Sequence, residues 1–250
     1  MGEKVFMQGN AALSESAIRA GCKMFFGYPI TPSSEMPEYY AAEAPKRDLV
    51  FVQAETEVAA FNMIAGAAAA GKRAMTGTAG PGFSLGQEAM SYMAAAGLPA
   101  VVVNVMRPGP ADGEILGSQG DYFQAVKGGG HGDYNVICMT PYSVQEQADM
   151  IQEAFDLAEK YLNPVIVLTD ATLAKMRESV VLPDEVTPKD ISFPGAVTGA
   201  KNREHNVITT CGDGPAQWEA FNLRLQEKYS KIRENEQKWE SIQVEDADIV

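Results

Sequence analysis

The sequence predicts an α/β protein built on a doubly wound, mostly parallel sheet, followed by a C-terminal extended linker and a helix. Two observations lead to this prediction. Segments of helical and of strand character alternate from residue 5 to residue 170, and 46% of the 250 residues are apolar, which is ample for a packed core. Such alternation is typical of parallel strands joined by crossover helices, so we expect helices to cover the sheet.

The expected elements follow one another at regular spacing along the first domain, residues 1–182. Short runs rich in β-branched and aromatic side chains predict strands at 23–28, 49–53, 73–78, 100–106, 135–139 and 164–168. Helical periodicity predicts helices at 10–21, 33–44, 55–71, 82–96 and 143–161.

The C-terminal part has a different character. Residues 183–215 are rich in Pro, Gly, Asp and Asn without periodicity, which predicts an extended linker. Residues 216–243 predict an amphipathic linker helix, mostly solvated, with a narrow apolar stripe. Residues 244–250 resemble the beginning of a buried strand, so we expect them to start a truncated second domain.

Composition and charge exclude several classes of partner. The net charge of −13 would repel a phosphate backbone, so we expect no nucleic acid. No apolar run approaches the ~20 residues that a membrane span needs, and the first ten residues lack a signal-peptide pattern, so we expect a cytoplasmic protein without membrane contact. Three scattered cysteines and two histidines are too few for an iron–sulfur cluster or a structural zinc site, which places any redox metal in another chain.

The first candidate site element is the segment 27–34, Gly-Tyr-Pro-Ile-Thr-Pro-Ser-Ser, between an expected strand and an expected helix. Ligands of open α/β sheets bind at the carboxyl ends of strands, which is where this loop should lie. The alternative interpretation is structural, because two prolines stiffen the loop and Ser33 or Ser34 could cap the helix.

The second element is the turn Gln-Ala-Glu-Thr-Glu, residues 53–57, before a helix rich in Ala and Gly. Its small side chains would let another backbone or subunit approach closely. Glu57 falls in the first helical turn, where it could also serve only to complement the helix dipole.

Two further elements follow the next strands. Residues 77–84, Gly-Thr-Ala-Gly-Pro-Gly-Phe-Ser, could offer backbone amides to an anion, or could simply be a tight turn that lets a helix pack closely. Arg107 follows an apolar strand, where it could grip a carboxylate through two parallel hydrogen bonds, or could form a surface or interface ion pair.

Together these four elements resemble the pyrimidine-binding domain of thiamine-diphosphate-dependent 2-oxoacid:ferredoxin oxidoreductases, over roughly residues 1–180. Residues 121–134, DYFQAVKGGGHGDY, look more like the branched-chain (2-oxoisovalerate, or 3-methyl-2-oxobutanoate) type of alpha subunit than the 2-oxoglutarate or pyruvate types. The resemblance implies that residues 1–182 form the pyrimidine-binding domain.

The resemblance also implies roles for individual residues. Glu57 would be the catalytic glutamate that hydrogen-bonds N1′ of the cofactor's aminopyrimidine. We choose it over Glu55 because its spacing to Gly66, nine residues along the same helix, fits the family pattern better. Thr31 and Arg107 would bind the 2-oxoacid. Tyr28 and Pro29 would line the pyrimidine site with Glu57, and no metal ligand is expected in this chain.

The implied reaction is oxidative decarboxylation of a 2-oxoacid to acyl-coenzyme A and CO₂, with electrons passed to ferredoxin. Thiamine diphosphate would touch this chain at its pyrimidine end, while magnesium, the diphosphate and the iron–sulfur clusters would lie on partner subunits. A Gly-Asp-Gly motif at 212–214 is a poor candidate for the diphosphate site, because no apolar strand precedes it.

The chain alone should therefore be inactive, and a hetero-oligomer is expected, with a dimer of this chain left open. Two rival interpretations are an α/β nucleotide-binding protein without thiamine chemistry and a non-catalytic assembly subunit. His131, within a Gly-rich segment, could contact substrate or a neighbouring subunit, or could structure its loop.

Overall fold

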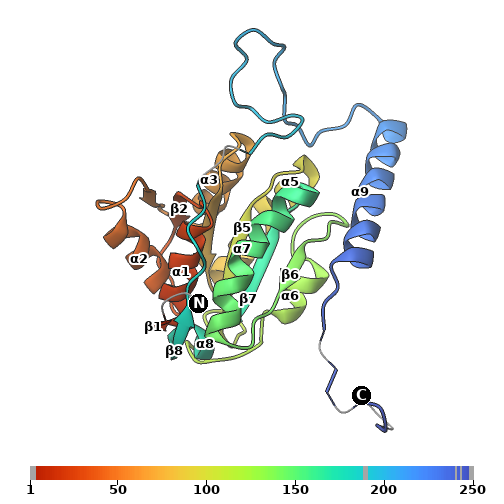
Figure 1. Cartoon of the computed structure of the whole chain (residues 1–250). Coiled ribbons are helices and arrows are strands. Elements are labelled where there is room, and N and C mark those ends of the chain that lie inside the picture. The colour runs from red at the N-terminus through yellow and green to blue at the C-terminus, as the bar shows by residue number, and fades with distance from the viewer. Residues whose placement is uncertain (1–3, 188–190, 240, 243, 248–250) are drawn as a thin grey trace. The chain divides into compact units, whose positions relative to one another are not determined.

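The computed structural model of the chain describes residues 4–187, 191–239, 241–242 and 244–247 (Figure 1). Contacts divide the chain into two compact units, Met1–Cys211 and Gly212–Val250. The first unit is built on one parallel sheet, and the second is dominated by a single helix.

The sheet of the first unit has six strands, all parallel. Their spatial order is β3 (Val50–Gln53), β2 (Met24–Gly27), β4 (Ala74–Thr78), β5 (Val101–Met106), β7 (Val165–Asp170) and β6 (Ile137–Met139). Strands β4 and β5 are buried along their whole length, as expected for central strands covered on both faces. The predicted α/β fold with a mostly parallel sheet is confirmed.

The helices divide between the two faces of this sheet. On one face α1 (Gly9–Arg19) contacts both α2 (Glu35–Glu43) and α7 (Val144–Tyr161), and Figure 1 shows α1 and α7 running side by side. On the other, α3 (Glu57–Ala69) contacts α5 (Gln87–Ala96). The core between this second helix pair and the sheet is made of Phe61, Ile64, Phe83, Met90, Met93, Val102 and Ile166, among others.

The strand order creates a switch point between β2 and β4. From β2 the chain passes outward to the edge strand β3 and then returns past β2 to β4, which continues the sheet in the opposite direction. The loops after β2 and β4 therefore lead to helices on opposite faces and part at this point. A crevice at the carboxyl ends of the strands is the usual ligand site of such a sheet.

Several elements differ from the expectation. The predicted helix 82–96 is two helices, α4 (Gly80–Leu85) and α5, joined at Gly86. A Cβ at Gly86 would lie 2.3 Å from the Phe61 ring, so the junction fits closely over α3. Four short elements have no strong periodicity and were not predicted: β1 (Lys4–Gln8), β8 (Arg177–Val181), α6 (Tyr122–Lys127) and α8 (Ala171–Lys175). Strands β1 and β8 form a separate antiparallel pair.

The described residues of the expected linker from 183 to 214 form no helix or strand, Pro215 already begins α9, and residues 191 and 197 are hydrogen-bonded to the residues at the end of α3. The amide of Ile191 donates to the carbonyl of Gly71 at 2.7 Å, and the amide of Val197 donates to that of Ala69 at 2.8 Å. In the second unit α9 (Pro215–Asn235) is shorter than the predicted helix 216–243. The expected domain boundaries stay predictions, and residues 248–250 of the expected second domain lie outside the described residues.

Within the described part of the chain, no helix combines the length and the apolarity needed to cross a membrane.

A buried carboxylate joins α1 to α2. The side chain of Glu15 is 4% exposed and accepts hydrogen bonds from Arg47 at 2.8 and 3.1 Å, from Arg19 at 2.7 Å and from Tyr39 at 2.9 Å. Burial acts to raise the pKa of Glu15, but the bonds from Arg47, Arg19 and Tyr39 outweigh it and hold this pKa below 4.5, the ordinary value. The carboxylate therefore stabilises the folded chain in its charged form.

We expect Glu15→Gln to lower the free energy of unfolding at pH 7 by about 3 kcal/mol, because it leaves two arginines without their shared charge partner. A carboxyl group whose pKa is lower in the folded chain than in the unfolded chain stabilises the folded chain at pH values above its unfolded pKa. This stabilisation is lost as the pH falls through the pKa of the folded chain. The wild type should thus lose stability below pH 4.5 more steeply than the variant.

Urea unfolding between pH 7 and pH 3 checks this expectation, with Glu38→Gln, an exposed change on α2, as the control. Equal pH slopes for the wild type and Glu15→Gln would contradict it.

Candidate active site

Four loops at the carboxyl end of the sheet hold all the site residues that the sequence predicts. Residues 27–34 follow β2, Glu57 follows β3, Gly80 follows β4 and Arg107 follows β5. Because the strands are parallel and adjacent, these loops gather at one edge of the sheet, around the switch point.

Glu57 is the first residue of α3 and its residue is 5% exposed. The preceding Thr56 caps the helix, accepting a bond from the amide of Ala59 at 3.1 Å. Glu55, two residues earlier, is exposed. Burial therefore separates the two glutamates of this turn and favours Glu57 as the functional one.

The carboxylate of Glu57 lies directly against Gly82 at the start of α4. A Cβ at Gly82 would stand 2.4 Å from Glu57 Oε1 and also 2.4 Å from Thr78 Oγ1, so a glycine is required for this close approach. Among the described residues, no donor bonds to the Glu57 carboxylate, and the buried hydroxyl of Thr78 has no partner either.

A carboxylate on a residue this little exposed, with no protein donor bonded to it, can accept a hydrogen bond from a ligand. The Glu57 carboxyl group can hydrogen-bond a ring nitrogen of a bound heterocycle, and the glycine beside it leaves room for a close approach. These residues fit the pyrimidine end of the thiamine diphosphate that the sequence resemblance implies.

Arg107 and Thr31, the two predicted substrate residues, are brought together by the fold. Arg107 is 8% exposed, and its Nη1 donates to the backbone carbonyl of Thr31 at 2.8 Å. Its Nε is buried without a partner among the described residues. The arginine stem lies over Gly80, where φ is +42° and a Cβ would come within 3.1 Å of Nε. The contact uses the Thr31 carbonyl, so a role for the Thr31 hydroxyl stays a prediction.

The loop after β2 presents Tyr28 and Pro29 at the exposed rim of the site. Ser33 turns inward, because its amide and its hydroxyl both donate to the carbonyl of Ile30, at 2.9 and 2.8 Å. The residue before α2, Ser34, makes no side-chain capping bond. The serines therefore do not act as the helix cap that the alternative interpretation proposed.

A cavity of about 700 Å³ opens beside Arg107. It is lined by Gly80, Pro81, Ser84, Leu85, Arg107, Pro108, Gly109, Pro110, Ala111, Gly120 and Asp121. Its walls are largely apolar, with one guanidinium and one carboxylate. Such a volume is within the usual range for small-molecule sites.

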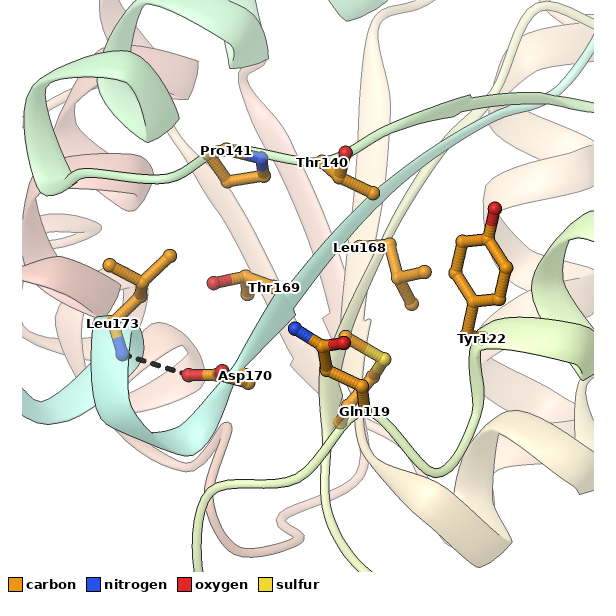
Figure 2. A pocket seen from close by; sticks show the side chains of 9 residues that line it. Gln119, Tyr122, Thr140, Pro141, Leu168, Thr169, Asp170 and Leu173 are labelled. Atoms are coloured by element: carbon orange, nitrogen blue, oxygen red, sulfur yellow. Dashed lines mark hydrogen bonds between the residues drawn. The ribbon is translucent and has the colours of Figure 1, made fainter. Parts of the chain in front are cut away.

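A second, smaller cavity of about 160 Å³ lies at the ends of β5, β6 and β7 (Figure 2). The segment 119–122, which leads into α6, lines both cavities: Gln119 and Tyr122 line the small one, and Gly120 and Asp121 the large one. Figure 2 shows that Asp170, the charged residue of the small cavity, is engaged in capping α8 through the amide of Leu173 at 3.0 Å.

The Gly-rich segment around His131, residues 127–132, is held against helix α5 by hydrogen bonds. Its His131 is exposed, and the His131 carbonyl accepts a bond from the Ser91 hydroxyl at 2.7 Å. The hydroxyl of Tyr134 donates to Gln87 Oε1 at 3.0 Å and accepts from the amide of Gly130 at 3.1 Å. These bonds order the segment through its backbone and give the His131 side chain no partner among the described residues.

Sequence reasoning missed Asn10 and Thr78. Asn10, at the beginning of α1, donates from Nδ2 to the carbonyl of Pro32 at 2.8 Å. Nothing in the spacing of the motifs connects it with residues 27–34, and its polarity at a helix start was the one available signal. Thr78 ends a buried strand, where a β-branched residue is ordinary.

The cysteines are free, and no group of three or more His, Cys, Asp or Glu side chains suited to a metal occurs among the described residues. Burial raises the pKa of the Cys22 and Cys138 thiols to about 12, so both are protonated at neutral pH.

Comparison with known proteins identifies the family. The model of the thiamine-diphosphate-binding domain of pyruvate flavodoxin/ferredoxin oxidoreductases matches residues 15–245. The ketoisovalerate oxidoreductase subunit VorB of Methanothermobacter thermautotrophicus is 49% identical over 98% of this chain and 69% of its own length. The 2-oxoglutarate synthase subunit KorA of the same organism is 48% identical over 74% of this chain and 50% of its own.

A solved structure is also similar. The 2-oxoglutarate:ferredoxin oxidoreductase from Magnetococcus marinus, with 2-oxoglutarate, coenzyme A and succinyl-CoA bound, superposes with a TM-score of 0.85 at 31% identity. The match covers 95% of this chain and 46% of that one, so the chain spans about half of that relative. The family match over most of the sequence and the 49% identity show that this chain belongs to the pyruvate flavodoxin/ferredoxin oxidoreductase family, in its thiamine-diphosphate-binding domain, and is similar to the alpha-type subunits of ketoisovalerate oxidoreductase.

Proposed function

We propose that this chain is the pyrimidine-binding subunit of a thiamine-diphosphate-dependent 2-oxoacid:ferredoxin oxidoreductase, with 2-oxoisovalerate as its substrate. The observation that carries the proposal is Glu57, a residue only 5% exposed, whose carboxylate lies against Gly82 at the switch point of the sheet with no donor bonded to it among the described residues. The Thr31 and Arg107 pair on the neighbouring loops supports it.

The substrate assignment is supported by the large cavity and by the relatives. The cavity walls next to Arg107 are made mostly of apolar side chains, among them Pro81, Leu85 and Pro110, which suit a branched aliphatic group. The ketoisovalerate subunit aligns over 98% of this chain, whereas the 2-oxoglutarate subunit of the same organism aligns over 74%.

When bound, thiamine diphosphate supplies the nucleophilic carbon for attack on the 2-oxo group. Glu57 would hydrogen-bond N1′ of the aminopyrimidine, and Tyr28 and Pro29 would line the ring. Arg107 binds the substrate carboxylate, with Thr31 beside the reacting carbonyl. The low exposure of Glu57 and Arg107 strengthens the electrostatic interactions of both groups.

In this proposal, partner subunits and coenzyme A supply the remaining parts of the reaction. A diphosphate-binding subunit holds magnesium and the diphosphate, an iron–sulfur subunit passes electrons to ferredoxin, and coenzyme A takes the acyl group. The site is then completed at an interface, so this chain should be inactive by itself.

The test is to reconstitute the full-length subunit with its partners and to follow 2-oxoisovalerate-dependent, coenzyme-A-dependent dye reduction, with and without thiamine diphosphate. Activity that requires the cofactor is the expected result. Turnover of 2-oxoglutarate or pyruvate alone would correct the substrate, and no turnover of any 2-oxoacid would favour a non-catalytic assembly subunit.

A further inference from the structure

Two consecutive backbone carbonyls of the loop after β2 are each bound by a buried side chain from another element. Arg107, at the end of β5, donates from Nη1 to the carbonyl of Thr31 at 2.8 Å. Asn10, in the first turn of α1, donates from Nδ2 to the carbonyl of Pro32, also at 2.8 Å. The loop is thus anchored from two sides, and one of these anchors lies outside the motifs that define the site.

Asn10 is itself held in a defined orientation. It is fully buried, and its Nδ2 also donates to Oε2 of Glu35, at the start of α2, at 2.8 Å. Glu35 forms an ion pair with Lys175 of α8. Both hydrogens of the Asn10 amide therefore have acceptors, and the series Asn10, Glu35 and Lys175 links α1, α2 and α8.

The charge of Glu35 is maintained by the same contacts. Burial acts to raise its pKa, but the bonds from Lys175 and Asn10 lower it below the ordinary value. The carboxylate is therefore an anion at neutral pH and orients the Asn10 amide. Asn10 Oδ1 is buried and has no partner among the described residues, so Asn10 acts here as a donor.

We propose that Asn10 is a positioning residue of the active site, which holds the Pro32 carbonyl and thereby places Thr31 against Arg107. Its part in catalysis rests on the proposed function, whereas its part in ordering the loop does not. Because a displacement of about 1 Å in a catalytic constellation can cost ~10²-fold, loss of this anchor should lower kcat/KM for the 2-oxoacid.

The chain provides a closely matched control in Asn163. This asparagine is also fully buried, donates from Nδ2 to two backbone carbonyls, those of Asn135 and Pro164, at 3.1 and 3.2 Å, and has a buried Oδ1 without a partner. It precedes β7 and so lies at the amino ends of the strands, away from the site.

The experiment compares Asn10→Leu with Asn163→Leu in the reconstituted complex. Leucine keeps the approximate volume and removes the donors. We expect Asn10→Leu to lower kcat/KM for the 2-oxoacid about 10- to 100-fold, mainly through KM, and to speed amide hydrogen exchange in residues 28–36. Asn163→Leu should lower the unfolding temperature by about as much as Asn10→Leu does. It should leave kcat/KM and the amide hydrogen exchange of residues 28–36 near the wild-type values.

A second variant, Asn10→Ser, serves if Asn10→Leu does not assemble, because a shorter hydroxyl no longer reaches the Pro32 carbonyl. Equal kinetics for the Asn10 and Asn163 variants, or unchanged exchange in residues 28–36, would overturn the proposal. A wild-type complex without thiamine-dependent turnover would instead refute the proposed function, and the exchange measurement on the full chain would still decide whether Asn10 orders the loop.

Discussion

Glu57→Gln in the reconstituted enzyme should lower kcat by at least ~10²-fold, the usual contribution of a positioned acid–base group. Glutamine keeps the size of the side chain and one hydrogen-bond donor, but it cannot take up or release a proton. Since Glu57 is 5% exposed and has no bonded donor among the described residues, water cannot easily substitute for the missing carboxylate. Steady-state dye reduction at saturating thiamine diphosphate measures the effect.

The matched control for this change is Glu55→Gln in the same turn. Glu55 is exposed, so its variant should keep nearly the full kcat. Calorimetric titration of the complex with thiamine diphosphate separates weaker cofactor binding from slower chemistry. Preserved turnover in Glu57→Gln, or an equal loss in both variants, would end the assignment of Glu57 as the catalytic glutamate.

Arg107→Met should lower kcat/KM for the 2-oxoacid by about 10²-fold or more, because two charge-assisted hydrogen bonds to the substrate carboxylate are lost, together worth roughly 3 kcal/mol. The loss should appear mostly in KM, as expected for a group that binds the substrate before and during the reaction. Arg107→Lys should be intermediate, since lysine keeps the charge but not the two parallel bonds. Initial rates over a range of 2-oxoisovalerate concentrations test both variants.

Arg177→Met is the control, because Arg177 is an exposed arginine on β8 and belongs to none of the four loops of the site. An unchanged KM in Arg107→Met would show that Arg107 serves only to anchor the loop through the Thr31 carbonyl. In that case the substrate carboxylate must be bound by another group, and the proposed substrate site would have to be revised.

Much of the fold could be predicted from local patterns. Strand β5 is a run of apolar residues because both of its faces are buried, and α7 shows a clear amphipathic period because one face packs on α1. The break at Gly86 could not be predicted, since the residues on both sides of it have helical periodicity, and the close approach of the Phe61 ring to Gly86 depends on tertiary packing. The pairing of β1 with β8 depends on contacts between the two ends of the first unit, which local periodicity does not record.

The candidate active site could also be predicted only in part from the sequence. Its loops could be named from their composition and from their positions after predicted strands, because the carboxyl ends of parallel strands are a known place for ligands. Two glutamates two residues apart have similar local signals, however, and the structure separates them by burial: Glu57 lies under Gly82, while Glu55 faces solvent. The link between Asn10 and Pro32 spans 22 residues and joins a helix to a loop, so no motif indicates it.

The sequence by itself therefore determined the α/β class, the order of most helices and strands, the loops that form the site and the family to which they point. Periodicity and composition are local properties, and local sequence is sufficient to specify them. The tertiary structure decided the strand order, the burial of Glu57, the contact of Arg107 with Thr31 and the anchoring of the loop by Asn10. Each of these depends on the close packing of segments distant in the chain, whose geometry is fixed only when the whole domain folds.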